Sequence, residues 1–199
     1  MLVLLRHGES AANASGLISG RAESPLTERG LAQAAALSTV LAGAGRLITS
    51  PLGRARQTAA ALGLGLPVEV DERWTEMDYG ELEGTPVTDV PSELWRRWRA
   101  DVGFRPAGGE SLAEVGRRVR AACEELFAVA DAGARTSADV VVVSHVSPIK
   151  AAVAWSLGDG DAVVWNLYLS TASLTRVGWG VAGPVLRSFN HVPEPAAFP

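Results

Sequence analysis

The chain has 199 residues, of which 47% are hydrophobic and 20% are charged, and its formal net charge is −4. A chain of this length can bury one sizeable core and is short for two, so we expect a single domain over residues 1–199. The acidic balance excludes a general basic surface for binding nucleic acid or an anionic membrane. Cys123 is the only cysteine, which excludes an internal disulfide and favours a reducing, cytoplasmic location.

The apolar segments of the chain are short. Residues 1–5 form an apolar run without the basic segment or the cleavage site of a signal peptide. The uncharged stretch 162–175 is interrupted by polar residues and is shorter than the roughly 18 apolar residues that a membrane span needs. We therefore expect a soluble protein with no membrane partner and no nucleic-acid partner.

The first predicted element is a buried strand over residues 2–5, which read Leu-Val-Leu-Leu. The apolar run ends abruptly in Arg6, His7 and Gly8. A strand-to-helix turn of this kind places polar side chains and free backbone N–H groups over the end of a sheet, where open α/β folds bind ligands. The stretch therefore predicts a local anion site around His7.

The next segments predict two helices separated by a short strand. Residues 27–41 begin with a threonine as candidate N-cap and have apolar residues at helical spacing, which predicts an amphipathic helix. Residues 46–49 read as a strand. Ser50-Pro51 then has the N-cap and first-turn order of a second helix, which carries Arg54 and ends near residue 63.

The middle of the chain combines a short strand, an excursion and a long helix. Residues 68–70 predict a strand, and residues 74–80 have neither helical nor strand periodicity. The segment at about 84–110 contains three prolines and a patch rich in Trp and Arg, which is typical of a flap that leaves the main sheet. Residues 111–129 open with a capping box and continue with apolar residues at steps of three and four, which predicts a long helix.

The last third predicts a central strand and two strands near the end of the chain. Residues 139–143 are Asp followed by four valines, as expected for a strand covered on both faces. The strand ends in Ser144-His145, and Ser147-Pro148 again has the order of an N-cap and a first turn. Residues 172–177 and 185–189 are strand-like and are expected as antiparallel or edge additions.

Two histidines follow separate predicted strands, Arg6 precedes the first of them, and Arg54 lies early in a predicted helix. This set of side chains suits a dianionic phosphoryl group. Guanidinium groups match phosphate oxygens with paired donors, and a helix start adds backbone N–H groups. The sequence has no carboxylate cluster that would hold a metal at this site. We therefore expect Arg6, His7, Arg54 and His145 to act without a metal or another cofactor.

Six ordered segments resemble the histidine phosphatase superfamily, the phosphoglycerate-mutase-like proteins. The resemblance extends from residue 2 to about residue 190, and its order makes it far more specific than Arg-His-Gly alone. Its segments are Leu5-Arg6-His7-Gly8-Glu9-Ser10 with Asn13, Pro25 to Gly30, Ser50 to Ala55 with Thr58-Ala59, Glu76 to Gly84, Gly109-Glu110-Ser111, and Ser144-His145. With the element order, it implies an α/β three-layer sandwich whose mostly parallel sheet has helices on both faces and an antiparallel edge strand.

The resemblance also implies a role for each matched residue. His7 corresponds to the nucleophile that becomes a phosphohistidine, and Glu76 corresponds to the proton donor. The residues implied to surround the phosphoryl oxygens are Arg6, Arg54 and His145, and those implied to line the phosphate pocket are Asn13, Ser19, Gly20 and Arg21. Because an imidazole attacks only through an unprotonated nitrogen, we predict that a backbone carbonyl holds the other nitrogen of His7.

Two assignments stay open from sequence. Asp78, Glu81 and Glu83 lie near Glu76 and could supply the proton instead. The pair Trp95/Trp98, three residues apart, favours packing of the flap onto the body over recognition of an aromatic leaving group. For Cys123 and His191, we expect an inert core thiol and a surface side chain.

Within the family, the short excursion and the segment after His145 are more similar to the phosphatase branch than to the mutases. The chain is similar there to broad acid phosphatases and to α-ribazole phosphatase-like proteins. We therefore expect metal-independent hydrolysis of a small-molecule phosphate monoester through a phosphohistidine. Phosphoglycerate mutase-type transfer and a non-catalytic phospho-ligand binding protein remain the alternatives, and the resemblance leaves a homodimer open.

Overall fold

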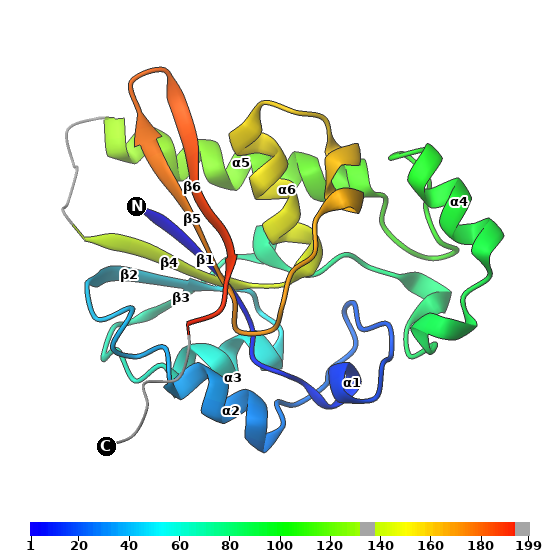
Figure 1. The fold of residues 1–199 in the computed structure, drawn as a ribbon, viewed down its shortest axis with the longest axis horizontal. Coiled ribbons are helices and arrows are strands. Elements are labelled where there is room, and N and C mark those ends of the chain that lie inside the picture. The colour runs from blue at the N-terminus through cyan, green and yellow to red at the C-terminus, as the bar shows by residue number, and fades with distance from the viewer. Residues whose placement is uncertain (132–137, 194–199) are drawn as a thin grey trace.

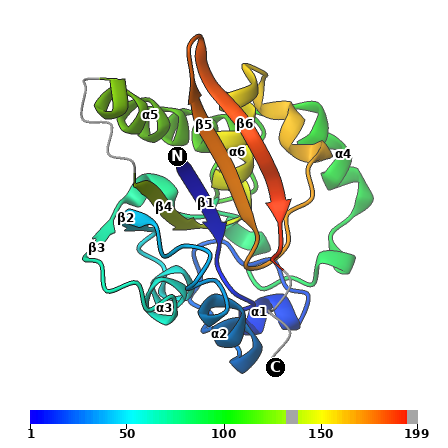
Figure 2. The same cartoon turned by 60° about the vertical axis from the view of Figure 1, so that its left-hand side comes forward.

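The computed structural model describes residues 1–131 and 138–193 and contains one mixed six-stranded sheet (Figure 1). The strand order is β3-β2-β4-β1-β5-β6, with β1 to β4 parallel and β5 and β6 antiparallel. The strands are β1 (Leu2–Arg6), β2 (Ala44–Thr49), β3 (Val68–Val70), β4 (Asp139–Ser144), β5 (Leu174–Gly180) and β6 (Gly183–His191). Figure 2 shows β5 and β6 extending the sheet beyond β1. The mostly parallel sheet with antiparallel edge strands is therefore confirmed.

Helices cover both faces of the sheet, as expected for three layers (Figure 1). The α-helices are α1 (Ala11–Ala14), α2 (Glu28–Ala35), α3 (Gly53–Ala61), α4 (Ser92–Ala100), α5 (Leu112–Asp131) and α6 (Val146–Leu157). Short 3-10 helices lie at Glu72–Trp74, Gly80–Leu82, Val87–Asp89 and Asp161–Asn166. Helices α5 and α6 cover one face, and α2 and α3 cover the other. Among the described helices, none combines the length and the hydropathy that a membrane span requires.

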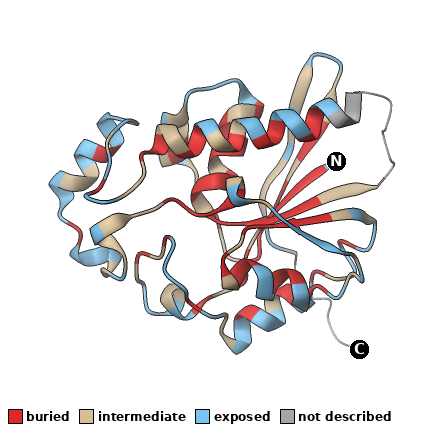
Figure 3. Cartoon of the chain, turned by 180° about the vertical axis from the view of Figure 1, so that it is seen from behind, coloured by how far each residue is buried: buried red, intermediate tan, exposed pale blue. Residues whose placement is uncertain are grey.

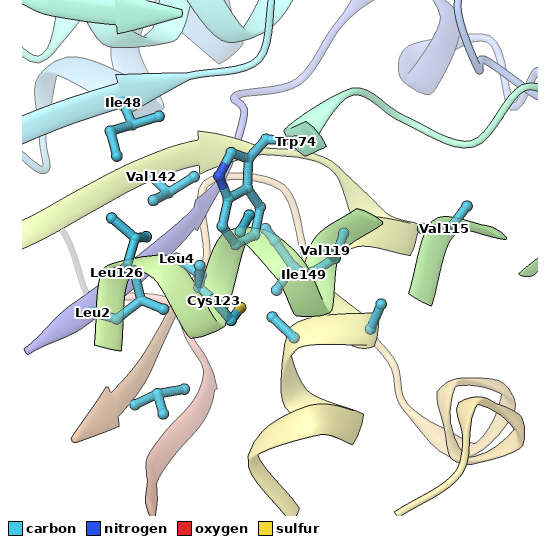
Figure 4. Packing of buried hydrophobic residues seen from close by; sticks show 14 of the residues in the cluster. Leu2, Leu4, Ile48, Trp74, Val115, Val119, Cys123, Leu126, Val142 and Ile149 are labelled. Atoms are coloured by element: carbon cyan, nitrogen blue, oxygen red, sulfur yellow. The ribbon is translucent and has the colours of Figure 1, made fainter. Parts of the chain in front are cut away.

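The alternation of side chains along β1 divides the core in two. Leu2 and Leu4 pack into a cluster with Cys123 of α5 and Ile149 of α6 (Figure 4). The side chains of Val3 and Leu5 point to the other face, toward α3 and the turns after α2. Because both faces of β1 are buried (Figure 3), the residue after the strand is delivered to a fixed position. Cys123 is buried in this core, as predicted, and burial raises the pKa of its thiol.

The predicted helix over 27–41 is shorter than expected, because α2 ends at Ala35 and residues 36–43 form successive turns. Leu37 and Leu41 are nevertheless buried against the sheet. The segment between them contains Ser, Thr and Val, whose side chains lower helix propensity. The apolar spacing therefore predicted the buried face correctly and the backbone conformation wrongly.

Two predicted N-caps are also wrong. Helix α3 begins at Gly53 with Leu52 as its cap residue, so Ser50 lies before the helix. Helix α6 begins at Val146 with His145 as its cap residue, which places Ser147 and Pro148 inside the first turn. Proline is tolerated there because the first N–H groups of a helix have no intrahelical acceptor. By contrast, the capping box predicted at the start of α5 is present, since Ser111 and Glu114 exchange hydrogen bonds.

The excursion after Gly84 contains the short helix α4 and extends away from the sheet (Figure 1). The segment is called the flap below, and it covers residues 84–110. Its main anchor is Trp98, which is completely buried. The indole of Trp98 stacks on Trp95, with ring centroids 5.6 Å apart, and meets Phe104 and Trp165 edge-on. The predicted packing role is therefore confirmed for Trp98, whereas Trp95 stacks on it and also lines a cavity.

Candidate active site

The two histidines are brought together by the pairing of β1 with β4. These strands are parallel, with Arg6 opposite Ser144, so His7 and His145 are the next residues at the same edge of the sheet. The His7 N–H donates to the Ser144 carbonyl at 3.0 Å. The imidazole ring centroids lie 5.0 Å apart. The sequence-based placement of both histidines at one end of the sheet is confirmed.

His7 is held as a neutral imidazole with a defined tautomer. Its Nδ1 lies 2.7 Å from the Gly8 carbonyl oxygen, which can only accept, so Nδ1 carries the hydrogen and Nε2 keeps a free lone pair. Burial holds the pKa of His7 well below its ordinary value, and the charges of Arg6 and Arg54 lower it further. The predicted carbonyl partner is present. The turn requires glycine at position 8, because a Cβ there would overlap the Gly30 carbonyl.

His145 has one nitrogen partnered and one without a partner. Its Nε2 lies 2.8 Å from the Ser50 hydroxyl oxygen, and the same oxygen accepts a hydrogen bond from the Leu52 N–H at 3.3 Å. Within the described residues, Nε2 is the only hydrogen-bond acceptor paired with that hydroxyl. Because a buried hydroxyl needs an acceptor, Ser50 donates to Nε2 and the ring proton lies on Nδ1. That Nδ1 is buried and has no partner in the described part of the chain, so it is a donor available to an anion.

Two guanidinium groups, one partly buried and one buried, supply positive charge without a carboxylate contact among the described residues. Arg6 donates to the Leu169 carbonyl at 2.6 Å, and its Nε has no partner among the described residues. Arg54 is 1% exposed and donates to the carbonyls of Gly20 and Ala22 at 2.5 and 3.0 Å. Burial lowers the pKa of both groups, although the nearby Glu76 opposes the shift. Buried charge without a counterion is unfavourable, so this pair favours binding of an anion.

The carboxylate of Glu76 links this site to the start of α6. Its oxygens accept from the Met77 N–H at 2.7 Å and from the Val146 and Ser147 N–H groups at 3.0 and 3.1 Å. These contacts fix the side chain in a buried position beside the cavity that His7 also lines.

The other carboxylates between residues 76 and 83 do not reach this cavity. Asp78 accepts from the Gly80 N–H, Glu81 is exposed, and Glu83 accepts from the N–H groups of Gly20 and Arg21. None of the three lines the cavity. The geometry therefore supports Glu76 as the carboxylate of the site.

A cavity of about 640 Å³ lies beside His7, and only some of the predicted site residues line it. Of the nine predicted residues, five line it: Arg6, His7, Asn13, Ser19 and Glu76. Arg54 and His145 are buried and do not line the cavity itself, while their charge and ring act on His7 at close range. The cavity therefore has an inner end around His7, lined by Arg6 and Glu76, and an outer part lined by residues farther from His7.

Gly20 and Arg21 lie outside the cavity. Gly20 is a packing residue, since its carbonyl accepts from Arg54 and a Cβ there would overlap Glu83. The Arg21 side chain is half exposed and forms long ion pairs with Asp78 and Glu110, at 3.6 and 3.5 Å. The structure therefore does not bring Arg21 to the wall where the resemblance places it.

Asn13 and Ser19 do face the cavity. Asn13 completes a capping box at the start of α1, with its Oδ1 accepting from the Ser10 N–H at 3.2 Å. This bond fixes the orientation of the carboxamide and leaves its NH2 group as a donor. The Ser19 hydroxyl is buried and has no partner within the described residues. Both side chains can therefore bind a polar ligand atom.

Sequence reasoning missed several residues of the site. Ser50 was interpreted as a helix cap, although its Ser-Pro motif also places it at the end of β2 beside β4. Tyr79 lines the cavity and its hydroxyl lies 3.2 Å from that of Ser147. Glu9 and Tyr168 line the outer part. For Tyr168 no periodicity or motif in the sequence indicated a role.

Comparison with known proteins identifies the class to which this fold and site belong. Residues 2–192 match the family model of the histidine phosphatase superfamily, branch 1. The chain therefore belongs to the histidine phosphatase superfamily. Within residues 1–131 and 138–193, no three His, Cys, Asp or Glu side chains group as a metal site requires.

The similar proteins include both phosphatases and a mutase. The chain is 38% identical over 182 residues to a bifunctional protein of Mycobacterium tuberculosis, a match that covers 87% of this chain and 49% of that protein. It thus spans about half the length of that relative. It is 35% identical over 210 residues to a probable phosphoglycerate mutase of Yersinia enterocolitica, covering 97% of this chain and 95% of that protein.

Two solved structures are phosphatases by name. A mycobacterial glucosyl-3-phosphoglycerate phosphatase superposes with a TM-score of 0.84 at 32% identity, covering 95% of this chain and 98% of that one. A putative α-ribazole-5′-P phosphatase from Escherichia coli gives a TM-score of 0.78 at 29% identity, covering 96% and 95%. These findings confirm the resemblance to the family and to α-ribazole phosphatase-like proteins.

Proposed function

We propose that this domain is a phosphatase that hydrolyses a small-molecule phosphate monoester through a phosphohistidine on Nε2 of His7. The observation that carries the proposal is the contact between Nδ1 of His7 and the Gly8 carbonyl. It leaves Nε2 as an unprotonated nucleophile at the edge of a cavity, within reach of the charges of Arg6 and Arg54. The phosphatase neighbours support the same reaction, and no metal or other cofactor enters the proposed steps.

In the first step, the Nε2 lone pair attacks phosphorus and the bond between phosphorus and the ester oxygen breaks. Glu76 gives a proton to the leaving alkoxide. In the second step, water attacks the phosphohistidine, gives its proton to Glu76 and releases phosphate, which regenerates His7. Arg6, Arg54 and the Nδ1–H of His145 stabilise the charge that develops on the phosphoryl oxygens. Asn13 and Ser19 orient the phosphoryl group or the ester oxygen.

The test measures phosphate release from a panel of phosphate monoesters by wild type and by His7→Ala. We expect release by wild type alone, together with an acid-labile, alkali-stable phosphoenzyme after brief incubation with a radiolabelled ester. His191→Ala is the matched control, because His191 is exposed and lies at the end of β6. Equal release by wild type and His7→Ala would exclude the mechanism, and the absence of release by wild type would leave a phospho-ligand binding protein.

The second candidate is phosphoryl transfer of the phosphoglycerate mutase type, which the Yersinia relative favours. A mutase returns the phosphoryl group to the bound product, so it isomerises 3-phosphoglycerate before phosphate appears. Proton-decoupled ³¹P NMR of one reaction distinguishes the two outcomes. We expect phosphate to accumulate without the isomer. Gel filtration of the same sample tests the homodimer.

A further inference from the structure

The outer part of the cavity, beyond His7, has two chemically different walls. One wall consists of apolar side chains from residues 17–18 and from the flap, and the other consists of polar side chains near α2 and before β5. The lining residues on the apolar side include Leu17, Ile18, Val87 and Trp95, and those on the polar side include Glu9, Arg29, Gln33, Ser170 and Thr171, while Tyr168 and Val192 also line the cavity. The phosphoryl group occupies the inner end, so these walls face the alcohol that leaves.

The apolar wall is built before any ligand binds. Backbone hydrogen bonds join residues 16–18 to the flap: the Ile18 N–H donates to Thr85 at 2.9 Å, and the Val87 N–H donates to Gly16 at 3.0 Å. Trp95 is held by stacking on the buried Trp98. An ordered apolar wall of this kind binds an apolar ligand face with little loss of side-chain entropy.

The polar wall carries no net charge. Arg29 is 74% exposed and its nearest carboxylate is Glu9, at 3.4 Å. Glu9 also accepts from the Thr27 hydroxyl at 2.9 Å, which holds it in place. The remaining groups are neutral, and Gln33 is oriented by the Glu9 N–H and by Thr171. This wall offers hydrogen bonds to neutral polar groups, whereas a carboxylate placed against Arg29 would also lie against Glu9.

The positive charge that has no ion pair among the described residues lies at the phosphoryl end. Among the described residues that line the cavity, the cations are Arg6 and Arg29 and the anions are Glu9 and Glu76. Arg29 is paired with Glu9, while Arg6 and the Arg54 behind it have no ion pair in the described part of the chain. A second anionic group on the substrate would therefore have no cation of its own.

We propose, on the basis of the phosphatase function proposed above, that the substrate is the phosphate ester of an uncharged alcohol with an apolar face. That face packs against Leu17, Val87 and Trp95. Neutral polar groups of the alcohol contact the polar wall that contains Gln33 and Thr171. Esters whose alcohol bears a carboxylate, phosphoglycerates among them, are poor substrates. The chain thus differs in substrate class from the relatives whose names contain phosphoglycerate.

The first test uses the wild-type chain and needs no variant. Benzyl phosphate, glycerol 3-phosphate and 3-phosphoglycerate all release a primary alcohol, and they differ in apolar face and charge. We expect kcat/KM to fall in that order, with benzyl phosphate roughly 10- to 200-fold above 3-phosphoglycerate. A kcat/KM for 3-phosphoglycerate equal to or above that for benzyl phosphate overturns the substrate inference and leaves the phosphatase proposal intact. If the wild-type chain cleaves none of the three esters faster than His7→Ala does, the phosphatase proposal itself is contradicted.

The second test alters each wall and measures a ratio of two substrates in the same protein. Trp95→Ala is expected to lower the ratio of benzyl phosphate to glycerol 3-phosphate about 10-fold, and Trp95→Phe is expected to keep most of it. Glu9→Gln removes the carboxylate beside Arg29 and should raise the ratio of 3-phosphoglycerate to glycerol 3-phosphate several-fold. Unchanged ratios in both Trp95→Ala and Glu9→Gln would overturn the two-wall assignment.

Discussion

The phosphoryl end of the cavity and the flap are built on different physical principles. At the phosphoryl end, His7 and His145 directly follow two paired strands whose faces are both buried. Backbone carbonyls then fix the side chains of His7, Arg6 and Arg54. The flap has no strand pairing of its own with the sheet, and it is anchored by aromatic stacking around Trp98.

This difference separates the reaction from the choice of substrate. The groups proposed to transfer the phosphoryl group gather at one edge of the sheet, and the pairing of β1 with β4 holds His7 and His145 there. The apolar wall that contacts the alcohol belongs largely to the flap, through Val87 and Trp95. Substitutions in one part are therefore expected to leave the other part working, which the following experiments test from the largest expected effect to the smallest.

Trp98→Ala should have the largest effect, on stability. Removing a fully buried indole that contacts Trp95, Phe104 and Trp165 leaves a cavity and should lower the free energy of unfolding by about 3–5 kcal/mol. Urea titration measures the loss. Trp98→Phe keeps an aromatic ring, so it should lose less than half as much free energy of unfolding as Trp98→Ala. If the two regions are separable, Trp98→Ala still forms the phosphoenzyme with glycerol 3-phosphate well below its melting temperature. A stable Trp98→Ala variant that forms no phosphoenzyme would show that the phosphoryl end depends on the flap.

Arg54→Ala should have the largest effect on the reaction. The guanidinium is buried near His7, and the loss of one such positioned donor reduces kcat by roughly 10²–10³-fold. The matched control is Arg56→Ala, which removes the same side chain from an exposed position two residues later on α3. Steady-state kinetics with benzyl phosphate compares the variants. Similar rates for Arg54→Ala and Arg56→Ala would remove Arg54 from the proposed mechanism.

The reaction end was predictable from sequence because its information is local. The apolar run of β1 and the valines of β4 indicate buried strands, and the residues that follow each strand must lie at the sheet edge. The capping box at Ser111 likewise involves residues three positions apart. For such features, tertiary contacts agree with the local preference, and the prediction is confirmed.

The features that sequence reasoning missed depend on contacts between distant segments. Ser50 is an acceptable N-cap by its neighbours, and only the pairing of β2 with β4 places its hydroxyl beside His145. Arg21 follows Gly20 directly, yet the hydrogen bond from Arg54 to the Gly20 carbonyl fixes that glycine beneath the site while Arg21 pairs at the surface. The apolar wall depends on an antiparallel backbone bridge between residues 17 and 86. No local pattern encodes these contacts.

Ser50→Ala should have a smaller effect on the reaction, through the tautomer of His145. Loss of the hydroxyl leaves Nε2 without its donor, so the ring proton no longer favours Nδ1. A hydrogen bond of this kind contributes about 0.5–1.5 kcal/mol, or roughly a 2- to 10-fold loss in kcat/KM. Nitrogen-15 NMR of the His145 ring should show Nδ1–H in wild type and in Ser50→Thr, and a shift toward Nε2–H in Ser50→Ala. The same ring spectrum in wild type and Ser50→Ala would contradict the assignment.

The dependence of stability on pH reports on the burial of the two histidines. Burial holds the pKa of both His7 and His145 well below the ordinary 6.5, and nearby positive charges add to the shift. The unfolded chain therefore binds protons on these rings near pH 6.5, while the folded chain does not. Since the unfolded state then holds more protons, stability falls as the pH drops below 6.5, by up to about 1.4 kcal/mol per pH unit for each histidine.

The carboxylates whose pKa is lowered do not account for a loss in that range. Partners hold the pKa of Glu69, Asp71 and Glu114 below their ordinary values of 4.5, 3.8 and 4.5. The stability they contribute is present above those values and is lost only at lower pH. Urea titrations between pH 5 and 7.5 should therefore show a slope that His145→Gln reduces by up to about 1.4 kcal/mol per pH unit, while His191→Gln leaves it unchanged. An equal slope in wild type and His145→Gln would mean that His145 gains its proton in the folded state as readily as in the unfolded one. The site would then lack the dry, cationic environment that distinguishes it from the flap.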